Sequence, residues 1–189
     1  MENILIISRS KNNILSFTET LHAAACSSVS SLHSCGDARR LLLEQDFDLV
    51  IIDAPLKDES GESLARHIAV KGLSQVLLIV KSEHFEEISS VTENDGVLVI
   101  SKPLNTALFW SALKLAASAQ VHTKRLQSEN SKLTQKIEDI RIIDRAKCIL
   151  ISFLNITEKE AHKYIEKHAM DMRTTRRKIA EGILKTYEE

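Results

Sequence analysis

The stretch Asp48-Leu49-Val50-Ile51-Ile52-Asp53 is a short, nearly continuous apolar run that ends in a carboxylate. Runs of the same kind, rich in branched residues, occupy residues 4–7, 76–80 and 97–100, and residues 28–33 form a weaker one. An apolar run without alternation is typical of a strand buried on both faces, as in a parallel sheet covered by helices. These runs therefore predict a five-stranded parallel sheet.

Helical segments are expected between the strands, at residues 12–25, 36–45, 61–70 and 104–118. Alternation of strands and helices is typical of a doubly wound α/β domain, which we place at residues 1–118. In such a sheet, functional groups gather outside the carboxyl ends of the strands. One crevice is therefore expected to hold Ser8, Arg9, Asp53, Val80 and Lys102.

Three features of this region resemble a response-regulator receiver domain, the CheY-like fold. Asp53 ends the third strand, as the phosphorylated aspartate of a receiver does, and Gly61 follows at the usual interval. The triplet Ser101-Lys102-Pro103 matches the lysine–proline step of the family. The resemblance covers residues 1–118 and implies an aspartate pocket at the carboxyl edge of the sheet.

The same region departs from the receiver pattern at three positions. A receiver holds Mg²⁺ with two acidic residues after its first strand, because the cation neutralises charge on the incoming phosphoryl group. Here that place reads Ser8-Arg9-Ser10. Val80 replaces the hydroxyl residue that contacts the phosphate, and Val99 stands where the aromatic switch is expected.

We therefore expect a pseudo-receiver, in which Asp53 is not readily phosphorylated and neither Mg²⁺ nor another cofactor is bound. Arg9 and Lys102 would supply positive charge where the metal sits, favouring the ionised form of Asp53. One alternative leaves Arg9 in solvent and Asp53 as a strand-end residue. Another is a conventional phosphorylation-activated response regulator with an unusual metal site.

Beyond residue 118 the apolar residues change period, and we expect a coiled-coil linker helix at residues 119–141. The seam repeats every seven residues without Gly or Pro and runs on into the following helix. An amide at an inner position favours a two-stranded state, because it needs its equivalent across the seam. The alternative is one long helix packed on its own receiver. The residues expected at a homodimer interface are Leu126, Asn130, Leu133, Ile137 and Ile140.

The remaining residues, 142–189, predict three short helices. Thr157 and Glu160 form a potential capping box for the second helix, and Thr174 or Thr175 can cap the third. Residues at buried-face spacing are expected to point inward: Ile142, Ile143, Ala146, Ile149, Leu150, Phe153, Ala161, Tyr164, Ile165, Ala169, Ile179, Ala180, Ile183, Leu184 and Tyr187. The sequence thus predicts an all-α unit behind the α/β domain.

This segment resembles the ANTAR domain of bacterial antitermination regulators, over roughly residues 125–187. The shared features include Ala146-Lys147, Glu160-Ala161, Ala169-Met170 and Ile179-Ala180, whereas Cys148 replaces the usual glycine. The resemblance implies binding to paired RNA stem-loops in a leader transcript. Residues 141–189 hold 11 Lys and Arg against 8 Asp and Glu, while residues 1–140 hold 14 against 18. The basic end of the chain is thus where RNA is expected.

We select as RNA-binding candidates Lys147, Lys167, His168, Arg173 and Arg176. An ordinary solvated cation is the alternative for each. Unpaired loop bases are accessible to stacking and edge contacts, whereas the deep groove of an RNA helix is not. Tyr164 and Tyr187 are expected in the core rather than as stacking platforms.

The whole chain of 189 residues shows no pattern of an enzyme, a zinc site or a membrane protein. Cys26, Cys35 and Cys148 lack a paired spacing and are expected to be reduced. No nucleophile stands beside a base, and no apolar run approaches the roughly 20 residues that span a bilayer. We expect a cytoplasmic, non-enzymatic protein without membrane contact or metal.

The sequence favours a homodimeric RNA-binding antitermination regulator, with a regulatory protein or a sensor kinase as a further partner. A three-helix basic end also suits a DNA-binding regulator, but the tight glycine turn of a helix-turn-helix is missing. A protein-binding scaffold that uses the linker helix is a third possibility.

Overall fold

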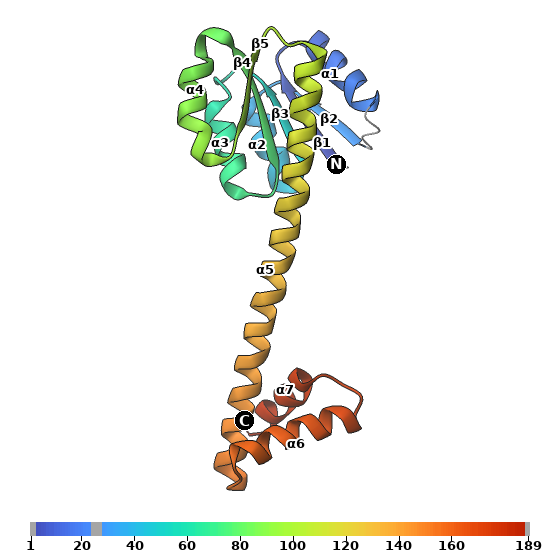
Figure 1. Ribbon diagram of the computed structural model, residues 1–189, viewed down its shortest axis with the longest axis vertical. Helices are drawn as coiled ribbons and strands as arrows, with labels where there is room; N and C mark the ends of the chain where they lie inside the picture. The colour runs from blue at the N-terminus through green and yellow to red at the C-terminus, as the bar shows by residue number, and fades with distance from the viewer. Residues whose placement is uncertain (1–2, 24–27, 188–189) are drawn as a thin grey trace. The chain divides into compact units, whose positions relative to one another are not determined.

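The computed structural model describes residues 3–23 and 28–187. It contains a five-stranded parallel sheet with the order β2-β1-β3-β4-β5 (Figure 1). The strands are β1 (Asn3–Ser8), β2 (Ser28–Leu32), β3 (Leu49–Asp53), β4 (Gln75–Lys81) and β5 (Leu98–Lys102). The predicted fold class is confirmed, and each strand lies on the expected run. Cys26 and the expected end of the first helix at residue 25 lie outside the described residues.

Helices cover both faces of the sheet. The elements that connect the strands are α1 (Lys11–Ala23), α2 (Cys35–Glu44), α3 (Glu62–Lys71) and α4 (Phe85–Thr92), with short turns η1 (Ser82–His84) and η2 (Glu93–Asp95) on either side of α4. The sequence analysis missed α4. This helix has only 8 residues, so its apolar pattern is limited to little more than Phe85 and Ile88, which pack on the sheet.

Alternate residues of each strand lie in two separate layers of the core, one on each face of the sheet. In β1, Leu5 and Ile7 pack with α2 and α3, whereas Ile4 and Ile6 pack with α1 and with α5 (Thr106–Leu154). These four side chains are fully buried. Burial on both faces explains why the strand runs are continuously apolar.

The register of the sheet positions the expected pocket. Ser8 pairs with Asp53 across β1 and β3, and Val80 pairs with Ser101 across β4 and β5. All of these residues lie at or near the carboxyl ends of their strands. Gly61, the N-cap residue just before α3, has a φ of 92°, and a Cβ there would lie 2.9 Å from Ile52 Cγ2. Glycine is therefore required by both backbone conformation and space.

The chain forms two compact units, residues 1–125 and 126–189. The boundary falls inside α5, which runs without a break from the sheet cover through the expected linker and into the first helix of the second unit, as the sequence predicted. Among residues 3–23 and 28–187, no helix combines the length and apolar character that crossing a membrane requires.

The second unit is a bundle of the end of α5 with α6 (Glu158–Asp171) and α7 (Arg176–Tyr187). The predicted capping box is present, because Glu160 accepts hydrogen bonds from the backbone N–H and hydroxyl of Thr157. Thr175 is the residue that caps α7, where its hydroxyl accepts from the Lys178 N–H. These caps fix where the two helices begin.

The bundle core is small and rich in alanine. Its buried members are Ala146, Leu150, Ala161, Ile165 and Ala180. Three expected core aromatics are instead exposed, with Phe153 at 63%, Tyr164 at 38% and Tyr187 at 37%. The prediction that these three point inward is wrong. Helices that meet at alanines approach too closely to hold rings between them.

Candidate functional site

Asp53 is buried at the end of β3 and is surrounded by polar groups of its own chain. Its Oδ2 accepts hydrogen bonds from the Ser8 hydroxyl at 2.6 Å and from the Asn13 side-chain amide at 2.8 Å. Its Oδ1 lies 2.6 Å from Lys102 Nζ. A buried carboxylate is costly unless it is paired and hydrogen-bonded, and these three partners meet that requirement.

Lys102 reaches the pocket from the end of β5. Its ammonium group also donates to the Ala54 carbonyl oxygen at 2.7 Å. Among the described residues, none donates a hydrogen bond of good geometry to Asp53 Oδ1, so the ion pair with Lys102 is what compensates this oxygen. The lysine therefore ties β5 to the loop after β3.

Arg9 is exposed, and Asp53 takes the partners described above from Ser8, Asn13 and Lys102 instead. The expected pairing of Arg9 with Asp53 is therefore not formed in the described residues. Asn13 was missed by the sequence analysis. Its signal was its place in the first turn after β1, where Ser10 caps the helix by accepting from the Asn13 N–H.

Val80 is buried and offers no hydroxyl, and Val99 is half-buried against the core. A cavity of about 300 Å³ beside Asp53 is lined by Asn13, Phe17 and Lys102, among others. The carboxylate of Asp53 is the acidic group in that lining. Mg²⁺ prefers several oxygen ligands and carboxylates among them, so this donor set fits the ion poorly.

A second group of titratable side chains does not include Asp53: Cys35, Asp58 and Glu59 come together. Asp58 accepts hydrogen bonds from the backbone N–H groups of Cys35 at 3.0 Å and Gly36 at 2.9 Å, and these bonds lower its pKa. Burial raises the pKa of the Cys35 thiol to about 11. Asp58 therefore caps α2, and the thiol stays protonated.

Two of the RNA-binding candidates are engaged in ion pairs within the bundle. Lys147 lies 2.7 Å from Asp144 and 3.5 Å from Glu158, with only 14% of its side chain exposed. The hydrogen bond to Asp144 raises the pKa of Lys147. Arg176 lies 3.7 Å from Glu166. Lys147 thus links α5 to the start of α6, and Arg176 links α7 to α6.

The other candidates gather at the carboxyl half of α6 and the turn after it. Lys167 and Arg173 are exposed, and Arg173 has a φ of 50°. The ring of His168 stacks on Tyr164 with a centroid distance of 4.1 Å, and its Nδ1 lies 2.9 Å from the Tyr164 carbonyl oxygen. This surface therefore presents exposed cations together with the stacked rings of Tyr164 and His168, which are partly exposed.

The residues of the expected dimer seam are exposed on α5. Leu126, Leu133, Ile137 and Ile140 show between 51% and 58% of their surface, and Asn130 is exposed as well. Large apolar side chains in a row on a polar helix are the signature of a surface that is buried by a partner.

Comparisons with known proteins agree with the division of the chain into an α/β unit and a helical bundle. The ANTAR domain family matches residues 131–184. The transcriptional regulatory protein PdtaR of Mycobacterium tuberculosis is 28% identical over 139 residues, which are 74% of this chain and 68% of that protein.

Solved structures share the fold of the first unit. A two-component response regulator from Clostridium difficile superposes with a TM-score of 0.53 at 20% identity, over 62% of this chain and 97% of that one. A CheY-like receiver domain from Methanospirillum hungatei gives a TM-score of 0.57 at 21% identity, over 65% and 98%. The chain thus combines a receiver-like fold in its first unit with an ANTAR domain match at residues 131–184, and in both parts it is similar to ANTAR response regulators.

Proposed function

We propose that this protein is a dimeric, RNA-binding transcription antitermination regulator whose receiver domain works without phosphorylation. The observation that carries the proposal is the ANTAR match at residues 131–184, which coincides with the basic bundle. Lys167, Arg173 and the Tyr164–His168 pair form an accessible surface on it. Cations hold phosphates and aromatic rings stack on unpaired loop bases, which is how proteins bind RNA hairpins.

The RNA role is tested by binding a two-hairpin RNA, the same RNA with altered loops, and duplex DNA. We expect the first to bind most tightly. Lys167→Ala and Arg173→Ala should each weaken binding and reduce the salt dependence by roughly one ion per lost contact. Lys185→Ala, a matched change on α7, should have little effect. Equal affinity for all three nucleic acids would contradict the proposal, and preference for the duplex would indicate a DNA-binding regulator.

Lys147 and Arg176 need a different readout, because both already hold ion pairs. Lys147→Ala should weaken RNA binding and also lower the melting temperature of the bundle. If it lowers only the melting temperature, its role is to position α6 rather than to contact phosphate.

The lack of phosphorylation is supported by the contents of the Asp53 pocket. Attack on a phosphoryl donor needs a free carboxylate oxygen and a cation that neutralises the phosphate. In this chain Ser8 and Asn13 occupy one oxygen, Lys102 holds the other, and no second carboxylate lines the cavity in the described residues. The input would then come from a regulatory protein, although a sensor kinase remains the partner if phosphorylation occurs.

Intact mass measured after incubation with acetyl phosphate and Mg²⁺ tests this part. We expect no mass gain. An adduct of about 80 Da that disappears in Asp53→Asn would contradict it and indicate a conventional response regulator. Arg9→Asp serves as a gain-of-function arm, because it returns one carboxylate to the position after β1.

The dimer is supported by the exposed seam on α5. Sedimentation should show a dimer at tens of micromolar, and Leu133→Glu should shift it to a monomer by burying charge in the seam. Thr134→Glu adds the same charge one residue away, outside the seam, and should leave the dimer intact. A monomeric parent protein would remove the dimer from the proposal.

A further inference from the structure

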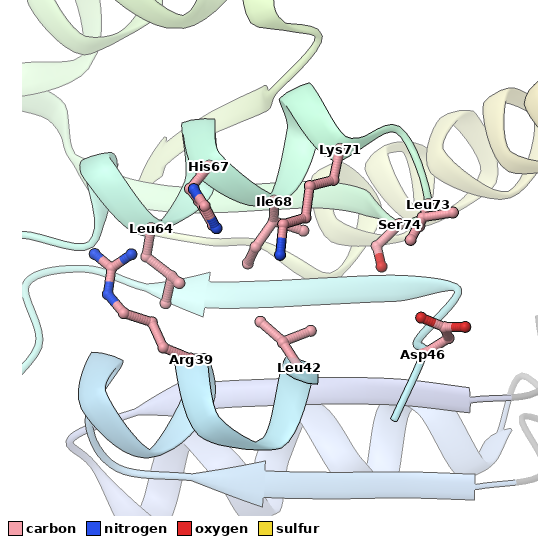
Figure 2. Close-up of a pocket in the computed structure, with 9 residues that line it drawn as sticks. All are labelled: Arg39, Leu42, Asp46, Leu64, His67, Ile68, Lys71, Leu73 and Ser74. Carbon is pink, nitrogen blue, oxygen red and sulfur yellow. The ribbon is translucent and has the colours of Figure 1, made fainter. Parts of the chain in front are cut away.

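A cavity of about 250 Å³ lies between α2 and α3, on the face of the sheet that these two helices cover (Figure 2). Asp46 and Ser74, which line one end, precede β3 and β4 and therefore mark the amino edge of the sheet. Asp53 ends β3 at the opposite edge. The cavity is thus separate from the Asp53 pocket.

The cavity is formed by two facing stripes of residues at helical spacing. Arg39 and Leu42 project from α2, and Leu64, Ile68 and Lys71 project from α3 towards them (Figure 2). Seven residues along a helix cover about 10 Å. A volume near 250 Å³ equals that of roughly eight water molecules at ~30 Å³ each. The space therefore suits a small, elongated molecule.

The floor of the cavity is apolar. Leu64 and Ile68 are buried, Leu42 is half-buried, and Leu73 remains 51% exposed beside the opening. Small-molecule sites are typically apolar with a few polar groups that orient the ligand. An alkyl or aryl group that enters here would cover apolar surface that the protein leaves open.

The polar groups around this floor are mainly basic. Arg39, His67 and Lys71 line the cavity, whereas Asp46 is the one carboxylate among the described lining residues. Glu59 already holds Arg39 at 2.8 Å. The described residues provide no ion pair for Lys71, whose ammonium group is directed into the gap in Figure 2. Lys71 is therefore the cation in this lining that is left to bind an anionic group.

We propose that this cavity binds a small organic monoanion, with a carboxylate or similar group beside Lys71 and His67 and an apolar body over Leu42 and Ile68. Asp46 at the far end disfavours a second negative group on the ligand. Such a site would give the receiver-type unit an input that does not pass through Asp53. The inference stands independently of RNA binding.

The test is a titration of the full-length, ¹⁵N-labelled protein with hexanoate, followed by backbone amide shifts. We expect saturable shifts in residues 39–46 and 64–74, and much weaker responses to hexylamine, to acetate and to adipate. Hexylamine reverses the charge, acetate lacks the apolar body, and adipate adds a second carboxylate. A response to hexanoate alone would support both the charge and the shape assigned to the site.

Two variants localise the binding. Lys71→Glu should weaken hexanoate binding roughly tenfold or more, because a charge-assisted contact is replaced by repulsion. Leu42→Trp should abolish it by filling the cavity. Lys114→Glu makes the same charge change on α5 and should not matter.

The proposal is overturned by the absence of saturable shifts up to about 20 mM hexanoate, the weak limit for a ligand of eight non-hydrogen atoms. It is equally overturned if hexylamine binds as well as hexanoate, or if Lys114→Glu weakens binding as much as Lys71→Glu. Lys71 is exposed, so Lys71→Glu should fold normally. The test therefore remains decisive even if Leu42→Trp does not fold.

Discussion

The α/β unit and the bundle both carry charged groups at their candidate sites, but the two units compensate these charges differently. In the α/β unit, Asp53 is buried and each carboxylate oxygen faces a polar group of the same chain. In the bundle, Lys147 and Arg176 are paired while Lys167 and Arg173 stay open. The charge of Asp53 is therefore compensated within its own unit, whereas the bundle keeps Lys167 and Arg173 exposed.

The hydrophobic cores of the two units also differ, in size and in the kind of side chain that they bury. The sheet buries long rows of branched side chains on both faces, and many of them are fully inaccessible. The central cluster of the bundle consists of Ala146, Leu150, Ala161, Ile165 and Ala180, surrounded by half-buried residues. A core of this size gives little stability by itself. The bundle should therefore be the less stable unit, and four predictions test the comparison.

The largest effect is expected from Leu150→Ala. Removing this buried side chain should cost about 3 kcal/mol through lost burial and a residual cavity. Because the bundle core has few other members, its melting transition should move far below that of the sheet in calorimetry. The control Leu77→Ala should lower only the sheet transition. A single transition that moves with both variants would show that the units unfold together.

The next effect concerns the two described cysteines. At equal pH, the thiolate fraction of Cys35 should be about 100-fold below that of an ordinary thiol, because burial raises its pKa from 9.0 to about 11. Cys148 is exposed on the bundle. In a Cys26→Ser background, iodoacetamide at pH 7.5 should modify Cys148 rapidly and Cys35 slowly, as measured by peptide mass mapping. Equal rates would contradict a closed α/β unit.

A smaller effect is expected at the capping box of α6. Thr157→Ala should destabilise the bundle by about 1 kcal/mol. The contribution of Glu160 to stability should depend on pH, because the Thr157 backbone N–H lowers the pKa of Glu160 in the folded state. Glu160→Gln removes the titrating carboxylate and should therefore remove this dependence. A lowered pKa stabilises the fold above the unfolded value of 4.5, and the gain is lost as pH falls through the folded value.

The melting temperature of Glu160→Gln should thus lie below that of the parent at pH 7 and should converge with it once the pH has fallen below the lowered pKa of Glu160 in the folded state. The sheet transition serves as an internal reference in the same scans. A difference between variant and parent that does not change with pH would rule out the carboxylate as the cause.

The smallest effect is expected from Arg173→Gly. Arg173 has a φ of 50°, a region that costs most side chains energy and that glycine adopts freely. The variant should gain roughly 0.5 kcal/mol of bundle stability, seen as a slightly higher melting temperature. Its RNA affinity should nevertheless fall as it does in Arg173→Ala. Retained affinity would show that the arginine contacts no RNA.

Local patterns in the sequence determined most of the fold. The five apolar runs predicted the strands, because a strand buried on both faces cannot be polar on either. The capping box of Thr157 and Glu160 predicted the start of α6, and the uninterrupted helical period through residue 141 predicted the continuous α5. Both predictions succeeded because each signal lies within a few helical turns of the chain. The missed α4 is only 8 residues long, so its apolar pattern is short, and Phe85 and Ile88 hold it against the sheet.

The site depended on contacts between residues that are far apart in the chain. The sequence placed Ser8, Asp53 and Lys102 at one edge of the sheet, because parallel strands end together. Only the tertiary structure brought Asn13 to Asp53, left Arg9 exposed and engaged Lys147 with Glu158. Side-chain partners of this kind depend on the directions in which loops and helix faces point in the folded protein. The periodicity of the sequence predicts helices and strands but does not predict those directions.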